Sequence, residues 1–346
     1  MSATLSYIGN VSRHLSLYYA PNTVRGLFRP GTNTQPYQPF PDLGGIGQIH
    51  YAGVSTYNSM QAKVQKRYSD GLSFLATYTW AHALDDASDA GGNFSAVGDR
   101  NQALIPYIDE YTNSSFDVRN RFTFDGSYQL PFGKGKDFFN QSKLANQIAG
   151  GWSTAITYAA QTGTPFTVSP NLSTAAGGGA RAYVMRDPYA GGGEPNATNP
   201  NIICPAQVGT KAHYFNPCAL ANPLPGETIS DANHPVGSVN PDGVPVMFKG
   251  PVTSTATAIR LLGGRQNNMY GPGYYQINMS LFKDFATWRE QYLQFRADAF
   301  NVLNHPTLGN PNGSINDNGG LISGPKFFQN DTPDARFFQL ALKYVF

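Results

Sequence analysis

A strict alternation of apolar and polar side chains ends this sequence, and it limits the fold more than any other feature. Large apolar residues occupy every second position from Phe338 to Phe346, with Gln, Ala, Lys and Val between them. Successive side chains of a β-strand point to opposite faces of the sheet. The segment therefore predicts a strand with one apolar face and one mixed, mostly polar face, as in a wall between lipid and a wet interior.

A second segment, Glu290–Asn304, shows the same alternation with stronger polarity on one side. Gln294, Arg296 and Asp298 fall on one strand face, while Leu, Phe and Ala residues fall on the other. Charged and amide groups are costly to bury in a dry core between two sheets. A water-filled interior would solvate them, so the segment favours a barrel wall over a sandwich.

The same alternation recurs along the chain and predicts eight strands. They are Thr4–Asn10, Tyr57–Arg67, Leu72–Trp80, Arg121–Leu130, Trp152–Gln161, Tyr275–Leu281, Glu290–Asn304 and Phe338–Phe346. Short connections at Tyr68–Gly71, Pro131–Ala149 and Ala286–Arg289 alternate with long ones at Val11–Val54, Leu84–Phe116, Pro165–Pro272 and His305–Ala335. Barrels of outer membranes have short periplasmic turns and long outer loops, so we expect every short turn at one end of the sheet.

The composition agrees with a barrel that spans a membrane. Charged residues make up only 13% of the chain and aromatic residues also 13%, which suits a lipid-facing wall with aromatic girdles. Tyr78, Trp80, Trp152 and Trp288 are the candidates for such girdles. No stretch reaches the roughly 18 apolar residues of a membrane helix, so any crossing would have to use strands. A net charge of +2 gives no electrostatic case for nucleic acid as a partner.

Two further features concern the termini and the longest connection. The N-terminus, MSATLSYIGNVSRHL, lacks the basic and apolar regions of a signal peptide. Because a secreted barrel needs one, and because Thr4–Ile8 already resembles the middle of a strand, we expect that the natural N-terminus is missing. Pro165–Pro272 is rich in Gly, Pro and Asn, and we expect a long surface loop with some short strands inside it.

The two cysteines, Cys204 and Cys218, lie in this same irregular stretch. They could close one loop disulfide in an oxidising compartment, or they could remain two free thiols. The sequence leaves both interpretations open. A single pair is too small a ligand set for a structural zinc site.

A group of acidic residues follows the third predicted strand. Asp85, Asp86 and Asp89 lie there with His82, and their oxygen atoms are ligands of the kind that Ca²⁺ takes. A solvated rim outside the membrane is the interpretation we favour, with calcium as the weaker alternative.

Four charged residues of the strands are candidates for contacts inside the barrel. Arg119, Arg121, Arg296 and Asp298 could line a ligand path, or they could form ion pairs that hold the wall together, which we favour. No catalytic motif accompanies them: G-x-S-x-G and H-E-x-x-H are both absent from the sequence. We therefore expect neither an enzyme nor a bound cofactor.

Several segments, in order along the chain, carry a resemblance to a known family. They are Tyr57–Asp89, Phe116–Lys136, Gly151–Val168, Gly264–Phe285 and Phe295–Pro306, together with the terminal Phe346. This set resembles the Oar-like TonB-dependent receptors, a family of outer-membrane proteins with a carboxypeptidase-regulatory-like N-terminal domain. The resemblance covers most of the chain outside the long loops.

The resemblance implies an all-β fold, an antiparallel transmembrane barrel of about 22 strands with a plugged lumen, of which these eight would be the last. Residues 1–346 would then be a partial barrel with a long extracellular loop at 165–272. The plug, the TonB-contacting box and the N-terminal domain have no match here. The implied partners are outer-membrane lipid, an extracellular ligand, the TonB complex through the missing region, and the barrel-assembly machinery, which would recognise Tyr344 and Phe346.

The leading hypothesis is thus part of a receptor that takes up or binds a large ligand in the bacterial outer membrane. One alternative is a small barrel that these eight strands close alone, serving as an adhesin or a passive pore. Another is a soluble, secreted β-protein that binds carbohydrate and buries its apolar strand faces between sheets. If the strands do come from a larger barrel, the lone chain should either curl into a strained small barrel or not work as a protein, because two edges remain unpaired.

Overall fold

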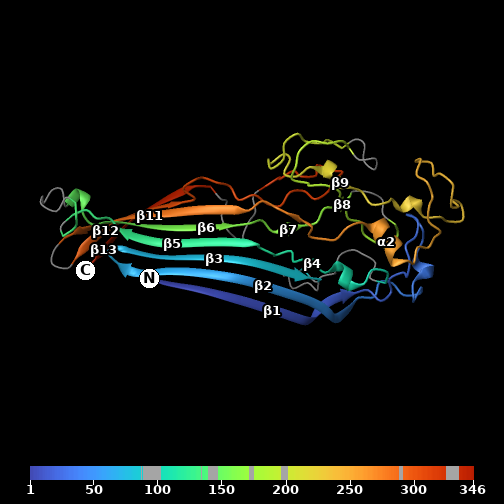
Figure 1. Ribbon diagram of the computed structural model, residues 1–346, viewed down its shortest axis with the longest axis horizontal. Helices are drawn as coiled ribbons and strands as arrows, with labels where there is room; N and C mark the ends of the chain where they lie inside the picture. Colours follow the sequence, from blue (N-terminus) through green and yellow to red (C-terminus); the bar gives the residue numbers. More distant parts are fainter. Residues whose placement is uncertain are drawn as a thin grey trace.

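The computed structural model describes residues 1–86, 88, 103–133, 135–138, 147–170, 175–195, 202–287, 291–324 and 335–346. The girdle candidate Trp288 lies outside the described residues. The molecule is elongated: a long twisted sheet fills one end, and the loops gather at the other (Figure 1). No described helix is long and apolar enough to cross a membrane.

One antiparallel sheet contains all eight predicted strands. In spatial order these are β1 (Ser2–Tyr19), β2 (Gln48–Ser69), β3 (Leu72–Asp85), β5 (Asn120–Gln129), β6 (Trp152–Gln161), β11 (Tyr274–Ala286), β12 (Tyr292–Phe300) and β13 (Phe337–Val345). A short ninth strand, β4 (Thr112–Asn113), pairs with the end of β3. The first two strands are much longer than predicted, and β12 ends before the predicted Asn304.

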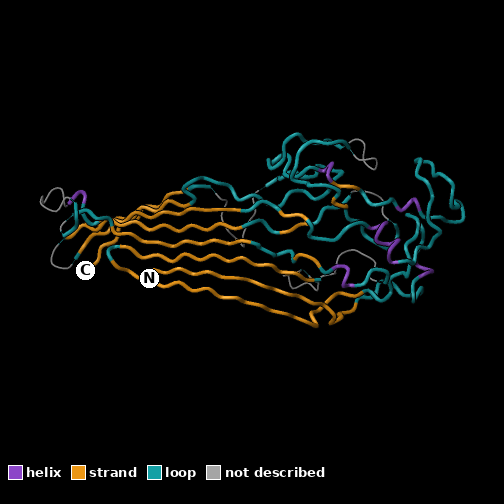
Figure 2. Tube along the Cα trace, viewed as in Figure 1, coloured by secondary structure: helices purple, strands orange, loops and turns teal. Residues whose placement is uncertain are grey.

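The short connections all lie at one end of the sheet, as predicted, together with both chain termini (Figure 1). Between β2 and β3 the turn consists of Asp70 and Gly71, both with positive φ (52° and 78°). Positive φ at both central residues is the geometry of the tight hairpin turn whose twist matches that of the strands. Figure 2 shows the four long connections leaving the opposite end of the sheet.

The sheet is open rather than closed into a barrel. β1 and β13 stand at the two ends of the strand order, and among the described residues each pairs with one neighbour only. The expected barrel is therefore represented here by a continuous segment of wall, and these strands do not curl into a small closed barrel.

The strand register sorts the side chains into two faces. Across four strands, Tyr78 pairs with Phe122, Phe122 with Ala160, and Ala160 with Tyr275. The neighbouring row is polar: the hydroxyls of Thr77 and Thr123, one step away, lie 2.6 Å apart. We call these the apolar face and the polar face of the sheet.

The apolar face is not covered by other parts of the described chain. Its exposed large side chains include Leu5, Tyr7, Met60, Tyr78, Trp80, Phe122, Met279, Leu281, Phe338, Leu340, Leu342 and Tyr344. A soluble sandwich would bury this face against a second sheet. The structure instead leaves it open over the whole width of the sheet, which contradicts what the soluble alternative predicted.

The dry core lies in the long connections. We call their described parts, residues 20–47, 86, 88, 103–119, 162–170, 175–195, 202–273 and 301–324, the loop cap. Within the longest connection, β7 (Pro165–Phe166) pairs with β10 (Met269–Tyr270) and β8 (Tyr183–Val184) with β9 (Leu220–Ala221), and helix α2 (Thr255–Leu262) follows β9. This stretch, expected to be loop-like with some short strands, thus also contains a helix.

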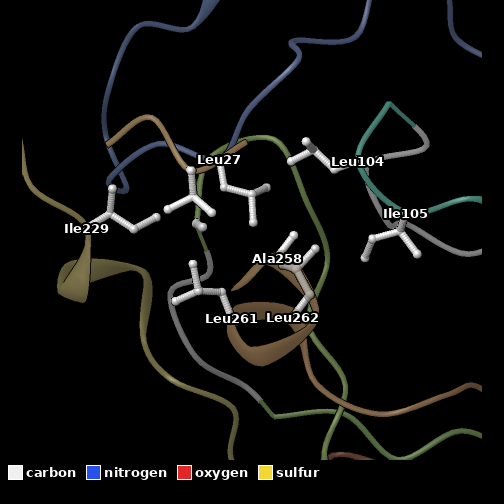
Figure 3. Packing of buried hydrophobic residues seen from close by; sticks show 9 residues of the cluster. Leu27, Leu104, Ile105, Ile229, Ala258, Leu261 and Leu262 are labelled. Carbon is white, nitrogen blue, oxygen red and sulfur yellow. The ribbon is translucent and has the colours of Figure 1, made fainter. Parts of the chain in front are cut away.

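Two apolar clusters hold the loop cap together. The first joins Leu27, Leu104 and Ile105 to Ile229 and to Ala258, Leu261 and Leu262 of α2 (Figure 3). The second joins Phe166, Val168, Ala182, Phe215, Leu220 and Met269 to Ile315 from the last long connection. All four long connections therefore share in one packed structure, because each supplies residues to a cluster.

Candidate functional site: the polar face and the loop cap

On the polar face, Asp298 and Arg296 form a hydrogen-bonded ion pair. The Asp298 carboxylate accepts hydrogen bonds from Ser280 Oγ at 2.5 Å and from Arg296 Nε at 2.8 Å. Arg296 also lies over the ring of Phe282, at 5.3 Å from its centroid. Asp298 is buried while the Arg296 side chain is 47% exposed, so this arginine holds Asp298 and still presents donors on the polar face.

The four charged candidates do not form one site. Arg121 is an exposed residue of the polar face on β5, separated from the strand of Arg296 by β6 and β11. Arg119 lies outside β5, where its Nε is 2.7 Å from Asp117 Oδ2 and 3.0 Å from Tyr270 OH. Arg119 therefore belongs to the loop cap.

Asp85, the last residue of β3, and Asp86, which follows it, are buried rather than on a solvated rim. Asp85 accepts hydrogen bonds from the hydroxyls of Ser88 and Ser114. Asp86 Oδ1 accepts one from Val54 N at 2.8 Å, which ties the cap to β2. Burial raises the pKa of Asp86, and the hydrogen bond from Val54 works against that rise.

The calcium alternative finds no ligand cluster among the described residues, where no three His, Cys, Asp or Glu side chains gather around one point. His82 contacts Arg119 Nη2 at 2.8 Å and Asn113 Oδ1 at 3.1 Å. The third aspartate, Asp89, lies outside the described residues.

Covalent and ionic links make the loop cap a preorganised surface. Cys204 and Cys218 are joined by a disulfide. Arg181 Nη1 donates to Glu110 Oε2 at 2.5 Å, and this ion pair is almost fully buried between two different connections. Buried ionic partners fix one geometry, because either charge alone would be costly.

A groove of about 920 Å³ lies where the loop cap meets the apolar face. Arg119, Tyr270 and His305 line it from the cap side, and Tyr78, Phe122, Tyr158 and Tyr275 line it from the sheet. Burial raises the pKa of Tyr270, with the hydrogen bond from Arg119 acting in the opposite direction, so the phenol is neutral at physiological pH. Sequence patterns did not reveal this groove, because Tyr270 and His305 belong to irregular connections that carry no periodic signal.

The proposed assembly signal lies at the turn end of the sheet. Tyr344 OH donates to Gln291 Oε1 at 2.6 Å, and the rings of Tyr344 and Phe346 are 6.4 Å apart. Phe346 is 95% exposed, so its ring is available to a partner.

Comparison with known proteins identifies a family. The sequence model of the family described as "Outer membrane beta barrel domain" matches residues 1–339. Among solved structures, the outer membrane transporter YddB from Escherichia coli is similar with a TM-score of 0.42 and 11% identity. The similarity covers 98% of this chain and 30% of that chain, so this chain spans less than a third of that protein. No curated protein sequence matches.

Proposed function

We propose that this chain forms part of the wall and the outer loops of a TonB-dependent receptor that takes up a large ligand. The chain belongs to the outer membrane beta barrel domain family and lies in the bacterial outer membrane. The apolar face contacts lipid and the polar face lines a wet interior. The loop cap faces the outside and captures the ligand, and the short turns face the periplasm.

One observation supports this proposal above the others. All four long connections converge at one end of an otherwise regular wall, and there they pack into a single cap with its own dry core. Ligand-binding loops on a rigid scaffold are the usual arrangement for recognition. The open edges at β1 and β13 suit a place within a wider barrel, because an unpaired edge is very costly in lipid.

The remaining parts of the proposal concern partners and chemistry. Arg121 and the exposed side of Arg296 are the candidates for ligand contacts on the polar face. The exposed Phe346 supports recognition of the C-terminus by the barrel-assembly machinery. We propose no catalytic step, and contact with the TonB complex would use a region outside these residues.

Competitive depletion tests the transport proposal. Cells with and without the gene are grown on a mixture of ferric chelates, oligosaccharides and peptides, and each solute in the medium is followed by mass spectrometry. We expect cells without the gene to deplete at least one large solute at least tenfold more slowly. Cells that carry the gene should deplete it equally slowly once an uncoupler collapses their proton-motive force. Equal depletion in both strains, or uptake that survives the uncoupler, would contradict an energised receptor.

A further inference from the structure

The groove beneath the loop cap continues into a second, smaller one. The second groove, about 460 Å³, is lined by Phe122, Phe124, Ile156, Tyr158, Tyr275, Ile277 and Leu303. Phe122, Tyr158 and Tyr275 line both grooves, so the two form one channel along the surface. We call them the upper groove and the lower groove.

Both grooves lie on the side of the sheet that faces lipid. The row from Tyr78 through Phe122 and Ala160 to Tyr275 forms the floor of the upper groove. The next row toward the turns, Phe124, Tyr158 and Ile277, forms the floor of the lower groove. The channel is therefore open to the membrane rather than to the interior of the barrel.

The upper groove is lined mainly by aromatic and other apolar surface, with a few polar groups among the rings. Tyr270 OH donates to Asp117 Oδ2 at 3.1 Å, and Tyr78 OH donates to Asn120 Oδ1 at 2.6 Å. The ring of His305 stacks on Tyr275, with centroids 4.1 Å apart. Tyrosine and histidine rings combine flat apolar faces with polar atoms, which matches the C–H and hydroxyl groups of a sugar ring.

The charge of the upper groove favours a ligand with a neutral polar group over a ligand with a bare phosphate. Arg119 is the cation that lines it, and the buried carboxylate of Asp117 compensates its charge at 2.7 Å. The Arg119 side chain is still 31% exposed, and its Nη1 makes no hydrogen bond with a described residue. The guanidinium can therefore donate hydrogen bonds to hydroxyl oxygens, while Asp117 leaves the groove without a net positive charge.

Among the described residues that line the lower groove, the polar side-chain groups are the hydroxyls of Tyr158 and Tyr275, which it shares with the upper groove. Leu303, just after β12, rises beside Ile277 because Val302 N donates to Ile277 O at 2.9 Å. An apolar channel on a lipid-facing wall suits a hydrocarbon chain. The upper groove and the lower groove meet where the loop cap begins.

We propose that this channel binds a glycolipid of the outer leaflet, with a neutral sugar head in the upper groove and an acyl chain along the lower groove. Bound there, the lipid would rest under the loop cap and hold it at the membrane surface. The inference rests on the proposed outward direction of the loop cap, and it does not require transport, so lipid binding and solute uptake can fail independently.

Native mass spectrometry tests the proposal on the full protein purified in mild detergent. The probes are glucosyl diacylglycerol, phosphatidylglycerol of the same acyl chains, and the free disaccharide maltose. The Ala160→Trp variant fills the upper groove. Its matched control, Ala297→Trp, adds the same side chain to the apolar face on β12, away from the grooves.

We expect one glucosyl diacylglycerol per protein, bound at least tenfold more tightly than phosphatidylglycerol. Ala160→Trp should lose this binding at least tenfold, and Ala297→Trp should keep it. The wild-type channel should also leave maltose unbound. Equal binding of both lipids, equal loss in both variants, or maltose that competes with the glycolipid would each overturn the assignment, and folding of each variant is checked by its unfolding temperature.

Discussion

At the scale of single residues, Asp86 shows how the loop cap is joined to the wall. The residue follows β3, is buried, and accepts a hydrogen bond from the backbone of Val54 on β2. Because burial raises its pKa above the ordinary 3.8, folding favours the protonated carboxyl. Protonated Asp86 therefore contributes fully to the free energy of unfolding at a pH below its pKa in the unfolded chain. This contribution is lost as the pH rises through its pKa in the folded chain.

The Asp86→Asn variant should be more stable than the wild type at neutral pH, since it keeps the acceptor for Val54 N and removes the buried charge. Its advantage should shrink as the pH falls toward 3.8, where the wild type becomes protonated. Unfolding temperatures in detergent at several pH values measure this, with the exposed Asp42→Asn as control. A variant that is less stable at neutral pH, or an advantage independent of pH, would contradict the account.

Residue types at this scale could be predicted better than their partners. The sequence singled out Asp85, Asp86 and the two cysteines. For the two aspartates it favoured a solvated rim over a calcium site, and the rim was wrong because both side chains are buried. Asp85 is held by Ser88 and Ser114, and Asp86 by Val54. Val54 and Ser114 are far from the aspartates in sequence, so only the folded chain reveals them.

At the scale of elements, the strands are the part that follows directly from the sequence. Side-chain alternation requires only local geometry, so β5, β6 and β13 were located to within one or two residues. β1 and β2 extend further, because they continue toward the cap through less regular sequence. The cap core was not predicted, since Leu27, Leu104 and Ile229 come from three separate connections without periodicity.

A pair of substitutions on β13 tests the two faces of a strand. Leu340→Arg places a charge on the apolar face, and Gln339→Arg places it on the polar face beside Asp298. Arginine at the lipid face costs about 2–4 kcal/mol near the middle of a bilayer. We expect Leu340→Arg to reduce the folded fraction in outer membranes severalfold, measured by gel mobility without heating, while Gln339→Arg assembles normally. Equal assembly of the two variants would refute the assignment of faces.

At the scale of the whole molecule, the open sheet separates the two membrane hypotheses. A small barrel formed by this chain alone must pair β1 with β13, whereas a wider barrel places other strands between them. The structure has β1 and β13 at opposite ends of the strand order. Local sequence signals say which segments are strands, but the number of strands that close a barrel depends on the assembled wall.

Disulfide cross-linking between pairs of introduced cysteines tests whether β1 and β13 are neighbours in the membrane. Cysteines at Leu5 and Leu342, or at Tyr7 and Leu340, should not cross-link in outer membranes, because β1 and β13 lie at opposite ends of the strand order. The control pair, Ala299→Cys with Phe338→Cys, joins direct partners on β12 and β13 and should cross-link readily. Efficient β1–β13 cross-links would support the stand-alone barrel instead.

A cysteine scan of β11 tests most directly whether the sheet is a wall with one lipid face and one wet face. This strand lies inside the sheet, so edge effects do not reach it. Each position from Gln276 to Leu281 carries a fluorescent label in turn, in vesicles that contain either brominated lipids or a water-soluble quencher. We expect lipid to quench the labels at 277, 279 and 281, and the aqueous reagent to quench those at 276, 278 and 280. Quenching without this alternation, or with the two sets exchanged, would contradict a wall with one lipid face and one wet face.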